Sequence, residues 1–124
     1  MKSNSFKEVA KLKMDQYVRF VYKITKNFPK DEMYGVISQI RRAAVSVILN
    51  YIEGFARRRP AVQLNFLEIS YGSLRETKYL LYLSKCEKYI NDNEYEFGFK
   101  LAEEIGAMLW TEIISLEKSI RYKE

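Results

Sequence analysis

Residues 33–59 read MYGVISQIRRAAVSVILNYIEGFARRR, and the architecture of the protein is predicted outward from this segment. Its apolar residues recur at steps of three and four, the spacing that places side chains on one face of an α-helix. We therefore predict one helix across the whole stretch, about 40 Å long. The face expected to enter the core consists of Met33, Val36, Ile37, Ile40, Ala44, Val47, Ile48, Tyr51 and Phe55.

The same stretch carries a second apolar flank, formed by Val45, Leu49 and Ile52. The polar stripe that remains is narrow, whereas a surface helix of a lone small domain normally has a wide polar face. We infer that the helix packs one side into the core of its own subunit and packs the flank against a second copy of the chain. The protein is therefore expected to be a homo-oligomer.

Three further helices are predicted around this stretch. The first begins near Ser5, which opens a capping-box pattern, and ends at Pro29. The third begins at Pro60, because a missing amide hydrogen is harmless at the first position of a helix. The fourth begins near Asn93, in a second capping-box pattern. Short connections make consecutive helices antiparallel, so we predict an all-α, single-domain protein, residues 1–124, folded as an antiparallel up-down four-helix bundle that is oligomeric.

The first and last of these helices have core positions at the same helical spacing. In the first helix the expected core positions are Phe6, Val9, Leu12, Val18, Val21, Ile24 and Phe28. In the last helix they are Ala102, Ile105, Leu109, Ile113, Leu116 and Ile120.

The composition favours a soluble protein without an enzymatic function. Hydrophobic residues make up 48% of the chain and charged residues 30%, and no apolar run approaches the length of a membrane-spanning helix. The single cysteine is typical of a cytoplasmic protein. The chain has no histidine, which removes the commonest general base and metal ligand near neutral pH. We expect no catalytic residues, no metal, no cofactor and no membrane partner.

The charges are distributed unevenly along the chain. The formal net charge is +5, yet the basic residues are in excess only in the first half and the acidic residues are in excess in the second half. Such an asymmetry is compatible with binding to a nucleic acid. It is equally compatible with electrostatic assembly, in which the early helices of one subunit meet the last helix of another. The sequence leaves both alternatives open.

The polar stripe of residues 33–59 is interpreted as a hydrogen-bonded seam. Glu53 could be a lone general base, but no histidine, second carboxylate or nucleophile stands beside it in the sequence. A structural role is favoured because a buried charge needs a partner, and Arg75 or Glu76 of the third helix could supply one. The seam residues are Gln39, Ser46, Asn50 and Glu53, flanked by Arg42 and Arg57.

Five arginines are the candidate nucleic-acid-binding residues: Arg41, Arg42, Arg57, Arg58 and Arg59. The last three form a cluster that is expected in the final turn of the long helix. Such a cluster can neutralise phosphates without reading base sequence. The simpler alternative is that it only solubilises the protein and interacts with the helix dipole.

Four segments of the chain resemble a known protein family. They are FPKDEMYG (residues 28–35), SQIRRAAVS (38–46), NYIEGFARR (50–58) and NFLEISYGSLRE (65–76). Together they are similar to the four-helix-bundle proteins encoded by intervening sequences in bacterial large-subunit ribosomal RNA genes, a group related to the accessory variability proteins of diversity-generating retroelements. The chain departs from the family at Ile48, where relatives often have proline, and at Ile52, where they often have alanine.

The resemblance implies a ring-forming homopentamer with a basic surface. It implies a role in binding RNA or DNA, and a reverse transcriptase as partner in the retroelement branch. At Ile48, the absence of a proline should leave the helix straight and restore one backbone hydrogen bond.

Overall fold

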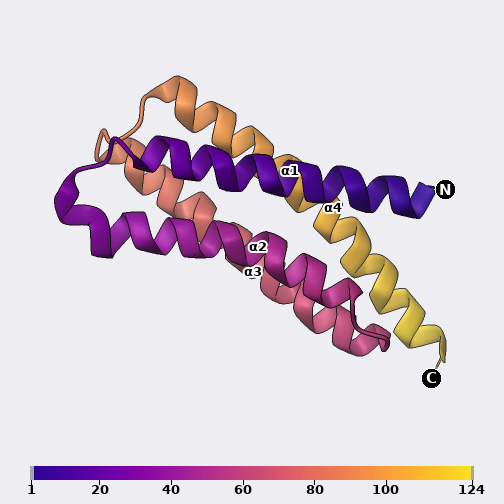
Figure 1. Ribbon diagram of the computed structural model, residues 1–124. Coiled ribbons are helices and arrows are strands. Elements are labelled where there is room, and N and C mark those ends of the chain that lie inside the picture. Colours follow the sequence, from indigo (N-terminus) through magenta and orange to yellow (C-terminus); the bar gives the residue numbers. More distant parts are fainter. Residues whose placement is uncertain (1, 124) are drawn as a thin grey trace.

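The computed structural model describes the backbone of residues 2–123 and consists of helices and their connections, with no strand in that part of the chain (Figure 1). The prediction of an all-helical protein with four helices is confirmed. The elements are α1 (Lys2–Thr25), a short 3-10 turn η1 (Lys30–Glu32), a π-helical turn η2 (Met33–Ile37), α2 (Ser38–Phe55), α3 (Pro60–Cys86) and α4 (Asp92–Lys123).

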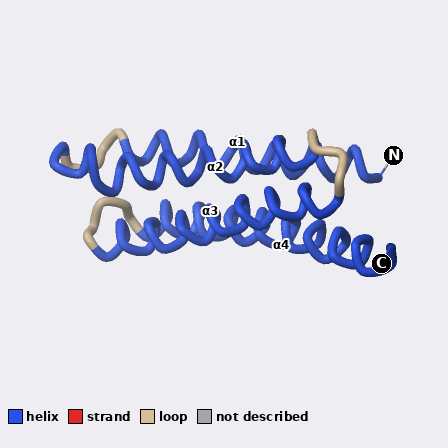
Figure 2. The backbone as a smooth tube through the Cα atoms, turned by 90° about the horizontal axis from the view of Figure 1, so that it is seen from below, coloured by secondary structure: helices blue, strands red, loops and turns tan. Residues whose placement is uncertain are grey.

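The four helices form an elongated bundle around one hydrophobic core. Both chain ends and the α2–α3 connection lie at one end, and the other two connections lie at the opposite end (Figures 1 and 2). Each helix contributes a row of enclosed side chains, such as Met14, Val47, Leu74 and Ile105. In α4, the predicted core positions Ala102, Ile105, Leu109 and Ile113 are buried.

The long second helix is shorter at both ends than the sequence predicts. Regular helix begins only at Ser38, because Gly35 has the non-helical angles φ −109° and ψ −113° within the π-helical turn. A Cβ at Gly35 would lie 2.6 Å from the Glu32 carboxylate oxygen, which accepts a hydrogen bond from the Val36 amide. Met33, expected in the core, is 49% exposed as a result.

At its other end α2 stops at Phe55, so the prediction that Arg57, Arg58 and Arg59 occupy its last turn is wrong. The reason is Pro60, since the residue before a proline is pushed out of the helical region. Arg59 accordingly is extended, with φ −92° and ψ 129°. Between its ends α2 runs without interruption through Ile48, as the absence of a proline there predicted.

The prediction for the first helix is wrong at its ends and in part of its core face. Helix α1 is already formed at Lys2, so Ser5 lies inside it, and it ends at Thr25. Val9 and Leu12 are 42% and 62% exposed. Val21, Ile24 and Phe28 are buried as predicted, and the other core residues of this segment are Ala10, Met14 and Tyr17. Ala10, Met14 and Tyr17 continue the helical spacing of Val21 and Ile24 toward the N-terminus, which leaves Val9 and Leu12 off the face that packs against the other helices.

The capping box before α4 lies two residues earlier than predicted. The Asn91 side chain accepts a hydrogen bond from the Glu94 amide at 2.8 Å, and the Glu94 side chain accepts one from the Asn91 amide at 2.9 Å. This reciprocal pair satisfies two backbone donors at the start of the helix. Among the described residues, no helix combines the length and the apolar character needed to cross a membrane.

Candidate nucleic-acid interface

The connection between α2 and α3 exposes three consecutive arginines at one end of the bundle. With Ala56 and Val62, Arg57, Arg58 and Arg59 line an open depression of about 340 Å³. Arg57 forms an ion pair with Glu53 at 3.4 Å. None of the carboxylates that the structure describes forms an ion pair with Arg58 or Arg59. Two guanidinium groups are therefore available to an external anion.

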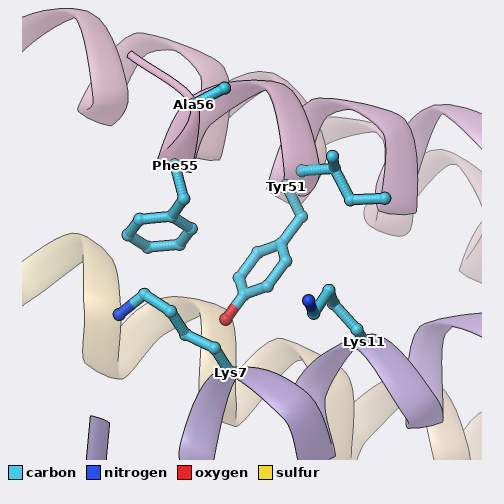
Figure 3. A pocket seen from close by; sticks show the side chains of 6 residues that line it. Lys7, Lys11, Tyr51, Phe55 and Ala56 are labelled. Atoms are coloured by element: carbon cyan, nitrogen blue, oxygen red, sulfur yellow. The ribbon is translucent and has the colours of Figure 1, made fainter. Parts of the chain in front are cut away.

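Two lysines of α1 lie next to this connection. Lys7 and Lys11 line a neighbouring pocket of about 260 Å³ that shares Ala56 with the arginine depression, and Figure 3 shows both side chains extending toward α2. The Lys7 ammonium lies 4.3 Å from the centre of the Phe55 ring. We call Lys7, Lys11, Arg57, Arg58 and Arg59 the basic end.

A buried tyrosine positions part of the basic end. The Tyr51 hydroxyl donates a hydrogen bond to Glu112 of α4, and the Lys7 ammonium lies 3.4 Å from the same carboxylate. Burial raises the pKa of Tyr51 well above its usual value, and the hydrogen bond and negative charge of Glu112 raise it further. The tyrosine thus stays neutral and remains a hydrogen-bond donor. This triad was not predicted, because its members come from three helices.

Arg41 and Arg42 do not belong to the basic end. Arg41 donates hydrogen bonds to the Thr25 hydroxyl at 2.8 Å and to the Tyr22 carbonyl oxygen at 3.4 Å, and its guanidinium lies 4.6 Å from the Tyr22 ring. Arg41 therefore supplies a hydrogen-bond donor to a backbone carbonyl group in the last turn of α1. About 21 Å of helix separates Arg41 from Phe55, the last residue of α2, and Arg57 lies beyond it. Arg42 is exposed on α2, between these two sites.

The structure brings together some of the predicted seam residues. The hydroxyls of Ser46 and Ser73 are 2.8 Å apart, which joins α2 to α3, and the Asn50 amide donates to both the carbonyl and the hydroxyl of Ser46 at 2.9 Å. Glu53 pairs with Arg57, and its side chain is 46% exposed. Gln39 is exposed at the N-terminal end of α2, far from Glu53.

The seam is therefore not a row of enclosed charges. Neither Arg75 nor Glu76, the partners considered from the sequence, forms an ion pair or a hydrogen bond with Glu53 among the described contacts. The contacts between α2 and α3 are made by small residues. Ser70 donates to the Val47 carbonyl at 2.7 Å, and a Cβ at Gly54 would lie 3.1 Å from the Cβ of Phe66.

Part of the charge asymmetry is neutralised within the chain. Lys13 of α1 pairs with Glu104 of α4 at 3.1 Å, in addition to the Lys7–Glu112 pair. Lys78 of α3 pairs with Glu103 of α4. These acids of α4 are not all available to another subunit. The positive charge available to a partner is therefore better described by Arg58 and Arg59, which are unpaired within the described part of the chain, than by the net charge of the first half of the chain.

The structure places the chain among the small all-helical bundle proteins, with a cationic connection between α2 and α3 at one end. Among the described residues, no three metal-ligating side chains gather at one point. The chain belongs to the 23S rRNA-intervening sequence protein family, whose model matches residues 8–111. This match confirms the resemblance to proteins encoded by intervening sequences of ribosomal RNA genes.

A solved structure supports the same assignment. The crystal structure of a protein of unknown function from the S23 ribosomal protein family of Bacteroides thetaiotaomicron VPI-5482 is 28% identical in sequence, with a TM-score of 0.75. The similarity covers 84% of this chain and 97% of that one. No curated protein matches the chain.

Proposed function

We propose that this protein is a non-enzymatic, cytoplasmic homo-oligomer of antiparallel four-helix bundles that binds RNA through the basic end. The observation that carries the proposal is the pair Arg58 and Arg59, which are exposed in a depression that shares Ala56 with the Lys7 pocket and have no carboxylate partner among the described residues. Arginine binds phosphate oxygens through a planar set of donors. Contacts of this kind hold the RNA backbone and do not select a sequence.

Oligomerisation would raise the RNA affinity of the basic end. An assembly repeats the basic end several times, and linked sites bind one RNA more tightly than a single site does. The homopentamer, a DNA ligand and a reverse-transcriptase partner are implied by the family resemblance and stay predictions. The alternative is a purely structural or adaptor bundle, in which the same cations serve assembly.

Replacing both free arginines should weaken RNA binding and its salt dependence together. We expect Arg58→Gln/Arg59→Gln to lower the affinity for an RNA hairpin at least tenfold at low salt. The slope of log K against log salt should become shallower by about 1.4 to 1.8, because two phosphate contacts are lost. Fluorescence anisotropy across a salt series measures both quantities.

The matched control is Lys26→Gln/Lys30→Gln, which removes the same charge from exposed positions outside the basic end. It should leave the slope nearly unchanged. If both double variants weaken binding equally, the basic end is not the site. If the wild-type protein fails to bind RNA at low salt, or if the arginine variant changes the assembled mass and not the RNA affinity, the adaptor alternative replaces the proposal.

The exposed flank of α2 supports the oligomer. Leu49 is 57% exposed and Ile52 is 49% exposed, on the side of α2 that the sequence assigned to a second copy. We expect light scattering to give a multiple of 14.7 kDa for the wild type and a smaller mass for Leu49→Glu/Ile52→Glu. The variant should keep its helical circular dichroism, because neither side chain is in the core.

A volume-conserving variant at the same positions, Leu49→Ile/Ile52→Leu, should keep the wild-type mass. A wild-type chain that stays monomeric at high concentration would refute the oligomer.

A further inference from the structure

A pocket between α3 and α4 has aromatic walls. Trp110 is 51% exposed, and its ring lies 5.6 Å from the ring of Tyr71 at an angle of 43°. Gly106 lines the pocket between them and carries no side chain to fill it. The volume is about 290 Å³. This is at the lower limit of ligand pockets, which span about 300 to 1,000 Å³, and suits a small planar group.

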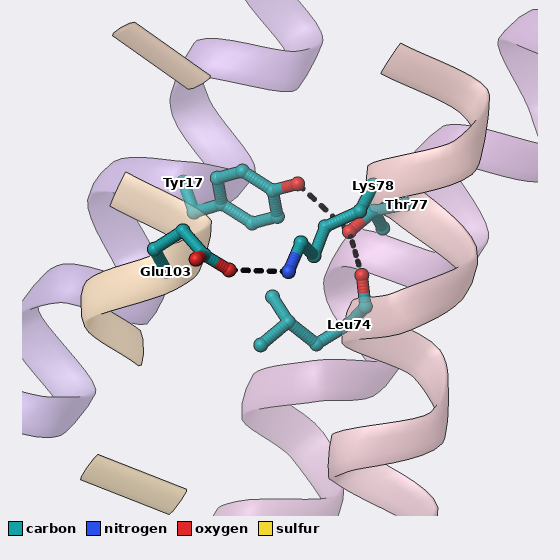
Figure 4. A network of polar contacts seen from close by, with 5 residues as sticks. All are labelled: Tyr17, Leu74, Thr77, Lys78 and Glu103. Atoms are coloured by element: carbon teal, nitrogen blue, oxygen red, sulfur yellow. Dashed lines mark hydrogen bonds and ion pairs between the residues drawn. The ribbon is translucent and has the colours of Figure 1, made fainter. Parts of the chain in front are cut away.

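Two cations of α3 line the same pocket. Lys78 pairs with Glu103, and the two side chains point toward one another in Figure 4. Arg75 is exposed and forms no ion pair with any carboxylate that the structure describes. The repulsion that Glu103 would exert on an anion is therefore offset by Lys78, and Arg75 supplies the excess positive charge.

Beyond the pocket, aromatic rings and cations continue to alternate between α3 and α4, and we call the pocket together with Phe99, Tyr95 and Lys85 the α3–α4 groove. Phe99 of α4 lies 5.3 Å from the Lys78 ammonium and stacks on Tyr95, with ring centres 5.8 Å apart. Lys85 of α3 lies 4.6 Å from the Tyr95 ring. Between Tyr71 and Lys85, α3 rises about 21 Å, which is longer than one nucleotide or one side chain of a ligand.

We propose that the α3–α4 groove binds single-stranded RNA, with an unpaired base stacked on Trp110 and the adjacent phosphate at Arg75. One exposed tryptophan beside half-buried aromatic rings and cations suits a single strand, because every base has a face that can stack and the backbone needs only positive charge. The bases of a duplex are stacked on one another and cannot enter the pocket.

This inference rests on the proposed function, since both require an RNA ligand, but it concerns a different surface. Helix α3 rises about 18 Å between Arg59 and Tyr71. An RNA that holds a duplex at the basic end would therefore need an unpaired tail to reach Trp110. The groove would then select RNAs that carry such a tail.

Trp110 reports its own environment because it is the single tryptophan of the chain. We expect a ten-nucleotide oligouridylate to quench its fluorescence, and a blunt duplex of the same length to leave it unchanged. Arg75→Gln should lower the oligouridylate affinity about 5- to 10-fold without changing the circular dichroism. Trp110→Ala should lower it roughly 5- to 150-fold, the range for loss of one stacked base.

Three results would overturn the inference. The first is oligouridylate binding, detected by anisotropy, without a change in Trp110 emission. The second is Trp110 emission that changes with protein concentration alone, which would show that a second copy covers the pocket. In both cases hairpin binding sensitive to Arg58→Gln/Arg59→Gln would leave the proposed function standing. The third is the absence of binding to any RNA at low salt, which would refute both.

Discussion

The Tyr17→Ala variant is expected to lose about 3 to 5 kcal/mol of unfolding free energy, the usual cost of truncating a large buried aromatic side chain. Tyr17 has no exposed surface and lies in the central layer of the bundle. Its hydroxyl donates a hydrogen bond to the Thr77 hydroxyl at 2.7 Å, and Thr77 donates to the Leu74 carbonyl at 2.6 Å (Figure 4). The substitution therefore opens a cavity and removes a hydrogen bond from α1 to α3. Urea unfolding followed by circular dichroism measures the loss.

Smaller substitutions separate the two contributions. Tyr17→Phe keeps the ring and should cost about 1 to 2 kcal/mol, because the fully buried Thr77 hydroxyl loses a partner. In Tyr17→Phe/Thr77→Val both polar groups are absent, so the double variant should be more stable than the sum of the single effects predicts. A Tyr17→Ala variant as stable as Tyr17→Phe would contradict the packing described for this layer.

The second large effect is expected at alkaline pH. Burial raises the pKa of Tyr17 above the usual tyrosine value of about 10, and burial and Glu112 do the same for Tyr51. Above about pH 10 the unfolded chain loses these protons while the folded chain keeps them. Unfolding is then favoured as the pH rises, so the stability present below pH 10 is lost through the folded-state pKa values. Urea midpoints should fall steadily above pH 10.

A spectroscopic titration tests the assignment directly. Part of the tyrosinate absorbance of the ten tyrosines should appear only together with the loss of helical circular dichroism. Tyr17→Phe and Tyr51→Phe should each reduce this late component. Tyr89 has its pKa raised to about 12 by its hydrogen bond to Glu32, so Tyr89→Phe checks for an intermediate component. Complete ionisation of all tyrosines in a chain that is still helical would refute the buried donors.

Prediction from the sequence succeeded for features that depend on the residues of a single helix. Apolar spacing identified the four helices and the buried face of α4, and Pro60 correctly marked the start of α3. It failed at Met33, Val9 and Leu12, where a large apolar residue proved exposed. In each case another apolar stripe or a backbone irregularity was available, and only packing against the other helices decided between them.

The candidate site shows the same division. Arg57, Arg58 and Arg59 could be named from the sequence because they are consecutive. The contact of Arg41 with Thr25 at the C-terminal end of α1 could not be inferred, since it depends on how α1 packs against α2. The aromatic groove of Trp110 and Tyr71 was missed altogether, because its members belong to different helices.

The helical character of the chain, the course of most of its helices and its family follow from the amino-acid sequence alone. These features depend on the periodicity of apolar residues, on proline and on a run of characteristic residues, all of which are local. Three other features became visible only in the packed bundle: Arg41 forms hydrogen bonds at the C-terminal end of α1, Lys7 meets Tyr51 through Glu112, and an aromatic pocket lies between α3 and α4. These contacts join side chains far apart in the chain, and their distances are set by how the helices pack.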